Sequence, residues 1–367
     1  MPANSDITAH YNAVTANQSP TSEIEKLIAH FQHEGFFHLA IAQERRRQVL
    51  RARLSTEFSG RVFMTRKTLG RAEVVLPGID VRYVEDGALG ELQADGAFED
   101  SILIANNNDV VQNGALDTYL NLFQNSPNTI FVAWDFDNHH WYPMSTFLAA
   151  HSDMYFPVHS DYFSLLSRYN RCIAGPVSSG VIQWSRSYLA ENFDNIIFAS
   201  RSDQPLGAHI VYGQFRFRSQ TISTLGGHFP ATVGFRTAAY HHISAADRLK
   251  EWCGHKAHWI IPVLNDIPTR LFDALTTGGV PIVPDTLKYH PTVAALAEHI
   301  VFFRATDIVA PQPVVDAANQ QFDAGGVGKI LERHRLGQTQ HHVSSRIETI
   351  LKTVFDEFSI PQTFTNA

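Results

Sequence analysis

The chain has 367 residues, of which 44% are hydrophobic, so it is long enough for two ordinary domains with apolar cores. Its 29 basic and 36 acidic residues give a net charge of -7, with no basic block that could follow a phosphate backbone, which argues against nucleic acid as a partner. The two cysteines, Cys172 and Cys253, lie far apart in the sequence. They predict neither a disulfide framework nor a thiolate zinc cluster.

The N-terminal residues, MPANSDITAHYNAV, lack the charged and then apolar order of a signal peptide, and no apolar run is long enough to cross a bilayer. We therefore expect a cytoplasmic protein, which could act next to a membrane. Residues 1–22 are rich in Asn, Ser, Thr and Ala and are expected to form a loose lead-in. Helical spacing of apolar residues then predicts a first helix from residue 22 and an arginine-rich helix over 41–54.

From residue 60, short apolar runs alternate with helical patterns, which is typical of a parallel sheet covered by helices on both faces. The first set of predicted strands covers residues 61–64, 81–84, 102–105, 129–134 and 154–157, with helices near 114–124, 143–150 and 160–168. The second set covers residues 196–199, 231–235, 259–263, 280–283 and 300–303, with helices at 216–225, 244–252, 268–276 and 291–298.

This rhythm predicts an α/β protein with two tandem Rossmann-like domains. The N-terminal domain is expected over residues 23–190 and the C-terminal domain over residues 191–340. Residues 341–367 are expected to contain a last helix that packs back across the structure.

The segment HWIIPVLNDIPTRLFDALTTGGVPIVPD, residues 258–285, combines a strand, a short helix and a second buried strand. Asp266 is a candidate N-cap, and two glycines end the helix before the second strand. The helix therefore begins at the carboxyl end of the first strand, where open α/β sheets bind ligands and free N–H groups favour a phosphate. Arg270 could pair with phosphate oxygens, and Asp273 could accept hydrogen bonds from a ribose diol. Alternatively, these two side chains form an ordinary surface pair.

The run TRLFDAL, residues 269–275, followed by GGVPIV, residues 278–283, resembles the C-terminal signature of GT-B glycosyltransferases, as found in exostosin-like and fucosyltransferase-like members. The resemblance implies a GT-B fold, in which a cleft separates the two Rossmann-like domains and the C-terminal domain binds a nucleotide-sugar. It also implies that Asp273 holds the nucleotide ribose and that the helix start, with Thr269 and Arg270, faces the diphosphate. Such enzymes need no metal and no cofactor besides the donor substrate.

The loop FASRSDQPLGAHIVYGQFRFRS, residues 198–219, follows a predicted strand and would approach the same diphosphate in a GT-B fold. Its glycines permit close approach of the backbone, and Arg201 or Arg218 could neutralise the leaving phosphate. The alternative is a loop with surface arginines.

The segment IFVAWDFDNHHWYP, residues 130–143, carries four candidate catalytic residues from a strand into one loop, and these are Asp135, Asp137, His139 and His140. Inverting glycosyl transfer needs a general base for the acceptor hydroxyl, and Asp or His can serve. Alternatively, the D-x-D pair in this loop could bind a divalent metal in a metal-dependent transferase or hydrolase, or the loop could simply cap the next helix. A second Rossmann-like unit favours the metal-independent reading.

Asn106 and Asp109, in the stretch IANNNDV, could contact an acceptor sugar, although an Asx-rich turn explains them equally well. Two short fragments, Glu85-Asp86-Gly87 and His290-Pro291, resemble motifs of bacterial GT-B sialyltransferases. The resemblance implies an acidic base and a His-Pro contact with a cytidine phosphate.

The sequence thus predicts a glycosyltransferase that moves a sugar from a nucleotide-sugar donor to a glycan or another hydroxyl acceptor, in surface polysaccharide or glycoconjugate synthesis. The alternative from another functional class is a non-catalytic sugar- or nucleotide-binding module of the same fold.

Overall fold

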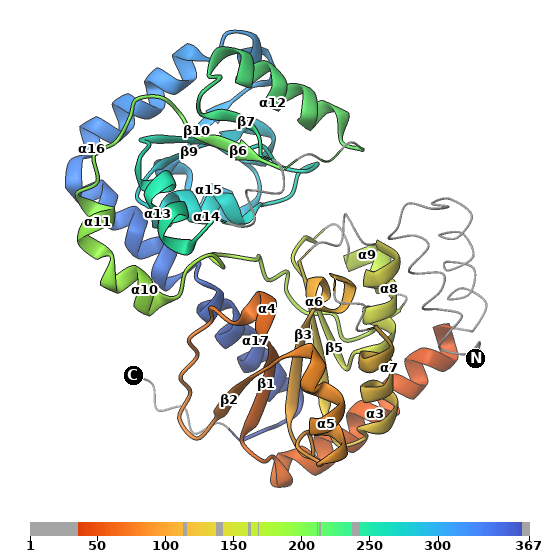
Figure 1. The fold of residues 1–367 in the computed structure, drawn as a ribbon. Helices are drawn as coiled ribbons and strands as arrows, with labels where there is room; N and C mark the ends of the chain where they lie inside the picture. Colours follow the sequence, from red (N-terminus) through yellow and green to blue (C-terminus); the bar gives the residue numbers. More distant parts are fainter. Residues whose placement is uncertain are drawn as a thin grey trace. The chain divides into compact units, whose positions relative to one another are not determined.

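The computed structural model describes residues 36–112, 116–136, 142–160, 163–167, 169–210, 212, 214–236 and 243–361. The chain divides into a first unit, made of Met1–Ser178 with Arg346–Ala367, and a second unit, Ser179–Ser345. Both units contain parallel strands with helices around them (Figure 1), so the expected α/β class with a parallel sheet is confirmed.

The first unit contains a parallel sheet of five strands in the order β2-β1-β3-β4-β5. The strands are β1 (Arg61–Thr65), β2 (Asp80–Val84), β3 (Ile102–Asn106), β4 (Ile130–Asp135) and β5 (Met154–Pro157). Every residue of β3 and β4 is buried, because helices cover both faces of a parallel sheet, and this explains their unbroken apolar runs. All five strands were predicted within one residue at each end.

The helices of the first unit are α3 (Phe36–Glu57), α4 (Arg66–Leu69), α5 (Leu89–Ala94), α6 (Asn107–Gln112), α7 (Leu116–Asn125), α8 (Tyr142–His151), α9 (Phe163–Leu166) and most of α17 (Val343–Glu357). The last helix returns to the first unit and contacts α3. Arg51 donates a hydrogen bond of 2.8 Å to the backbone oxygen of Glu357, and the rings of Phe58 and Phe355 meet edge to face at 5.8 Å. Residues distant in sequence thus complete one core.

The second unit has short parallel strands, β6 (Gly207–His209), β7 (Val233–Phe235), β8 (Ala257–Trp259), β9 (Val280–Pro284) and β10 (Val301–Phe303). One group pairs in the order β10-β9-β8 and the other as β6-β7, and a parallel bridge between Leu206 and His258 joins them. The order along the edge is therefore β7-β6-β8-β9-β10. When the strands of each unit are numbered along the chain, both sheets have the order 2-1-3-4-5.

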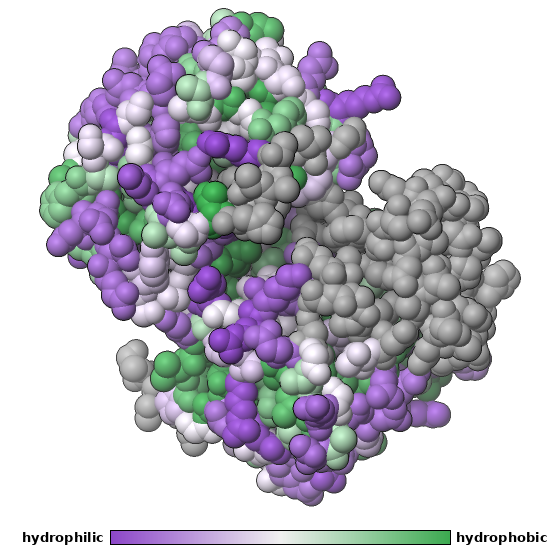
Figure 2. Space-filling view, viewed as in Figure 1, coloured by the Kyte–Doolittle hydropathy of each residue, from purple (hydrophilic) through white to green (hydrophobic). Residues whose placement is uncertain are grey.

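The helices of the second unit are α10 (Arg186–Glu191), α11 (Phe193–Ile197), α12 (Arg216–His228), α13 (Ala245–Cys253), α14 (Thr269–Thr276), α15 (Pro291–Ala294) and α16 (Gln312–Thr339), with 3-10 turns η4 (Asp285–Leu287), η5 (Ala297–His299) and η6 (Ala305–Val309). The long helix α16 is broken at Gly326, whose φ is 53°. Figure 2 shows mainly hydrophilic residues where α16 faces solvent, with smaller hydrophobic patches between them.

The predicted helix and strand on either side of the glycine pair are confirmed as α14 and β9. Gly278 has a φ of 78°, which closes the helix in the left-handed region. Gly279 leaves room for a buried ring, since a Cβ there would lie 2.4 Å from His258. A side chain at position 278 would strain the backbone, and a side chain at position 279 would clash with His258.

Two strand predictions for the second unit were wrong, and one strand was missed. Residues 196–199 are not a strand, because Ile196 and Ile197 form the buried face of α11. The strand expected at 259–263 ends at Trp259, and β6 was not predicted at all.

The helix expected from residue 22 lies outside the described residues up to residue 35. Within the described part of the chain, no helix is both long enough and apolar enough to span a membrane.

Candidate functional site

The strand order of each unit points to one edge of its sheet as a binding edge. In both sheets the strand order reverses between the first and third strands along the chain, which are β1 and β3 in the first unit and β6 and β8 in the second. Ligands of open α/β folds bind beside the carboxyl ends of the strands at such a reversal. The side chains at this edge are therefore candidates for function.

The carboxyl edge of the second sheet holds a cavity of about 480 Å³, within the size range of small-ligand sites. It lies among the start of α12 and the residues that follow β8, β9 and β10, and its lining includes Arg216, Phe217, Arg218, Ile261, Leu264 and Thr286. Aromatic and aliphatic side chains form much of the wall, while two arginines supply positive charge. This combination suits a ligand with both a flat apolar part and an anionic part.

Two apolar side chains of this cavity are unusually exposed. Phe217 is 72% exposed and Leu264 is 65% exposed. Leu264 also has a φ of 54°, a left-handed conformation that is costly for a leucine. Backbone strain of this kind concentrates at binding and catalytic sites.

The start of α12 carries an unusual charge distribution. It has no acidic residue in its first turn and no side-chain cap, yet Arg216 and Arg218 lie there. The N-terminus of a helix is already electropositive, so two cations add repulsion unless an anion is bound. Arg216 is exposed and lines the cavity, which makes it available to such an anion.

Arg218, which lines the cavity, forms a basic group with His209 and Arg270 near the ends of β6 and β8. Arg218 is 3% exposed and donates a 2.7 Å hydrogen bond to the backbone oxygen of Ile210, and burial together with Arg270 lowers its pKa to about 10. His209 is fully buried, and burial followed by the charges of Arg270 and Arg218 holds its pKa well below the usual value. Neither ring nitrogen of His209 makes a well-formed hydrogen bond with the described residues, although the backbone of Trp259 lies near the ring.

Asp273 lies on α14 beside this basic group and is 2% exposed. Burial raises its pKa to about 8, although Arg270 and Arg248 act in the opposite direction. Its Oδ1 has no hydrogen-bond partner among the described residues. A buried carboxyl oxygen without a partner is costly, and a hydroxyl group of a ligand would remove that cost. Thr269 is the first residue of the same helix.

Arg201 lies at the opposite edge of the sheet from Arg218 and Arg270. Its guanidinium donates to the backbone oxygens of Ile196 at 2.8 Å and Thr277 at 2.7 Å. Thr277 follows the last turn of α14, so Arg201 binds the electronegative C-terminus of that helix. The structure therefore brings Thr269, Arg270 and Asp273 to the edge that Arg218 occupies, and does not bring Arg201 there.

Candidate residues of the first unit gather at the carboxyl ends of β3 and β4. Asn106 and Asp109 are buried, and Asp109 accepts a 2.6 Å hydrogen bond from Thr68. Asp135 is also buried and accepts a 2.5 Å hydrogen bond from the hydroxyl of Tyr155. The other three catalytic candidates, Asp137, His139 and His140, lie outside the described residues.

The two sialyltransferase-like fragments have ordinary structural contacts. Glu85 forms an exposed ion pair with Arg66, and the ring of His290 accepts a hydrogen bond from the backbone of Thr292 as the N-cap of α15.

His209 and Phe217 were not singled out from the sequence, and Arg216 was noted in the loop 198–219 but given no role. The cluster of Arg, Phe and Arg immediately after a glycine-containing loop was the one available signal. No protein-family model matches the chain, and no curated protein matches it significantly.

Proposed function

We propose that this chain is a metal-independent glycosyltransferase of the GT-B type, whose second unit binds a nucleotide-sugar donor. The observation that carries the proposal is the carboxyl edge of the second sheet. There, a cavity with apolar walls meets the basic start of α12, and Asp273 lies buried beside Arg270. The resemblance of residues 269–283 to the GT-B signature supports the same assignment.

Each part of the donor has a chemically matching group at this edge. The apolar wall with Phe217 suits the nucleobase, and Arg216, Arg218 and Arg270 suit the diphosphate. The partnerless oxygen of Asp273 suits a ribose hydroxyl. Stabilisation of the leaving diphosphate by fixed positive charge would then be the main catalytic contribution of this unit.

In the proposed reaction, the first unit supplies the acceptor side. A general base takes the proton of the acceptor hydroxyl. The hydroxyl oxygen of the acceptor attacks the anomeric carbon of the donor sugar, and the nucleoside diphosphate leaves. Asp135 is the described candidate for this base, and Asn106 and Asp109 lie at the same sheet edge. The two units would act as the tandem Rossmann-like domains of a GT-B enzyme. We place this activity in the cytoplasm, in surface polysaccharide or glycoconjugate synthesis.

The first test is a thermal-shift screen against UDP, GDP, CMP, dTDP and their sugars, each with and without EDTA. A ligand at 100 times its Kd stabilises the folded state by about 2.7 kcal/mol, which corresponds to several degrees in melting temperature. We expect a shift with one nucleotide class that EDTA does not remove. If none of these nucleotides shifts the melting temperature, the donor assignment is wrong.

The second test separates an enzyme from a non-catalytic binding module. Slow hydrolysis of the bound nucleotide-sugar by water, followed as release of the nucleoside diphosphate, is expected for the native protein. Asp135→Asn should reduce this release at unchanged donor affinity. Binding without any turnover, even with a panel of sugar acceptors, would favour the binding module.

A further inference from the structure

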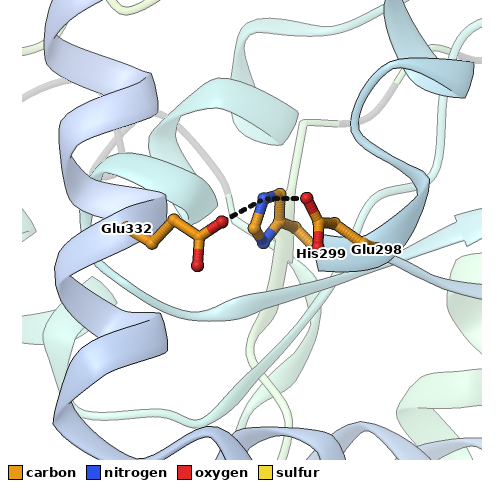
Figure 3. Close-up of side chains that lie close together, drawn as sticks. All are labelled: Glu298, His299 and Glu332. Carbon is orange, nitrogen blue, oxygen red and sulfur yellow. Dashed lines mark ion pairs between the residues drawn. The ribbon is translucent and has the colours of Figure 1, made fainter.

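A second group of polar side chains lies at the amino edge of the same sheet, where β10 begins. Glu298 and His299 belong to η5, and Glu332 comes from the second half of α16 (Figure 3). One nitrogen or oxygen atom from each side chain lies within 4.8 Å of the others. This edge is opposite to the one that holds the cavity, so the group is separate from the proposed donor site.

The imidazole of His299 has the position of a metal ligand. The side chain is 2% exposed, and the ring nitrogen that faces the two carboxylates is Nε2. Its Nε2 lies 3.5 Å from Oε1 of Glu298 and 3.6 Å from Oε1 of Glu332, which is too long for good hydrogen bonds. Two ligands of a tetrahedral zinc ion, each about 2.0 Å from the metal, lie roughly 3.3 Å apart. Both carboxylate oxygens therefore lie at nearly the co-ligand distance from the imidazole nitrogen.

Lys329 fixes the two carboxylates from their other side. Its Nζ lies 3.2 Å from Oε2 of Glu298 and 2.8 Å from Oε2 of Glu332. The lysine thus holds both Oε2 atoms and leaves both Oε1 atoms facing the imidazole. Hydrogen bonds to groups that bind a metal orient them in this way in known metal sites.

We propose that Glu298, His299 and Glu332 bind one Zn²⁺ ion, with water at the remaining coordination position. One imidazole and two carboxylates are ligands that zinc accepts. The ion would tie the part of α16 that follows the break at Gly326 to the start of β10, and so would stabilise the fold and take no part in the reaction.

The test uses the full chain, freed of metal with EDTA and then titrated with Co²⁺ and with Zn²⁺. We expect one equivalent of Co²⁺ to give the visible absorption of a tetrahedral complex and Zn²⁺ to displace it. Glu332→Gln should weaken Zn²⁺ binding at least tenfold, and because this residue is 43% exposed the variant should still fold. The matched control is Asp316→Asn, which removes one exposed carboxylate of α16 before the break and should bind Zn²⁺ as the native chain does.

Thermal unfolding provides the second readout. Zn²⁺ should raise the melting temperature of the native chain and of Asp316→Asn, and should leave that of Glu332→Gln unchanged. Glu298→Gln should behave as Glu332→Gln does. If the native chain binds no Zn²⁺ at micromolar concentrations, or if the two glutamine variants bind it as tightly as the native chain, the proposal is overturned and the three side chains form only an ion-pair network with Lys329.

Discussion

If the second unit binds a nucleotide-sugar as we propose, the ionisation of Asp273 should make the affinity for this donor depend on pH. Its pKa of about 8 in the free protein means that roughly one-tenth of the carboxyl groups are ionised at pH 7 and roughly nine-tenths at pH 9. If ribose hydroxyls donate to the ionised form, the apparent affinity follows the ionised fraction. We therefore expect affinity to rise about tenfold from pH 7 to pH 9, which is about 1.4 kcal/mol.

Isothermal titration calorimetry with the nucleotide-sugar found in the screen measures this effect. The diphosphate of a nucleotide-sugar is esterified at both ends and does not titrate in this range, so it is not a source of the pH dependence. At pH 7, binding should release close to one proton per site, seen as a dependence of the apparent enthalpy on the buffer's ionisation enthalpy. Asp273→Asn cannot ionise and should lose both the proton release and the pH dependence.

The pH dependence of the stability of the ligand-free protein provides a control, because Asp273 affects stability and ligand affinity in opposite directions. The pKa of Asp273 is raised above the 3.8 of an unperturbed carboxyl, so the folded state binds this proton more tightly than the unfolded state. The contribution of Asp273 is therefore full below about pH 4 and is lost as pH rises through about 8, and Asp273→Asn should remove it. An affinity that stays flat between pH 7 and pH 9, or an equal pH slope in the asparagine variant, would refute the role of Asp273.

Three further outcomes follow from individual side chains. Arg216→Ala should weaken nucleotide-sugar binding about tenfold without lowering the melting temperature of the free protein, whereas Arg236→Ala, which breaks an exposed pair with Glu251 and does not line the cavity, should bind normally in the same titration. Burial holds the pKa of His258 well below 6.5, so the folded state resists its protonation and stability should fall as pH drops below about 6.5. Urea unfolding at pH 7.5 and pH 5.5 should show a smaller loss for His258→Phe. Gly279→Ala would place a Cβ 2.4 Å from the ring of His258 and should cost about 1–3 kcal/mol in urea unfolding, whereas Gly90→Ala meets no atom within 4 Å and should cost nothing.

The first sheet could be predicted from the sequence because burial on both faces leaves a clear signal. Every residue of β3 and β4 is buried, so each strand is an unbroken apolar run with polar residues at its end. The strand β6 gives no such signal, since its three residues are Gly207, Ala208 and His209. The run that was taken for a strand instead, residues 196–199, begins with the two buried residues of the short helix α11, and apolar runs of four residues do not distinguish a helix from a strand.

The wrong strand at 196–199 explains why Arg201 was predicted as a site residue and His209 was not. With a strand at 196–199, Arg201 would follow a carboxyl end and face a ligand. With β6 in its place, Arg201 precedes the strand and lies at the amino edge, while His209 takes the position at the carboxyl end. Arg270 and Asp273 were predicted independently of that strand, because the glycine pair and the proline-containing strand after them mark their helix clearly.

The two edges of the second sheet place the same residue type in opposite electrostatic settings. At the amino edge, Arg201 and Arg333 donate to the backbone oxygens of Thr277 and Gly278 at the end of α14, where the helix dipole favours a cation. At the carboxyl edge, Arg216 and Arg218 lie at the start of α12, where the dipole opposes a cation and Arg270 adds further repulsion. A fold gains stability from the first arrangement and loses it in the second. Such a loss is typical of sites organised in advance for a charged ligand, and a diphosphate has the charge that would reverse it.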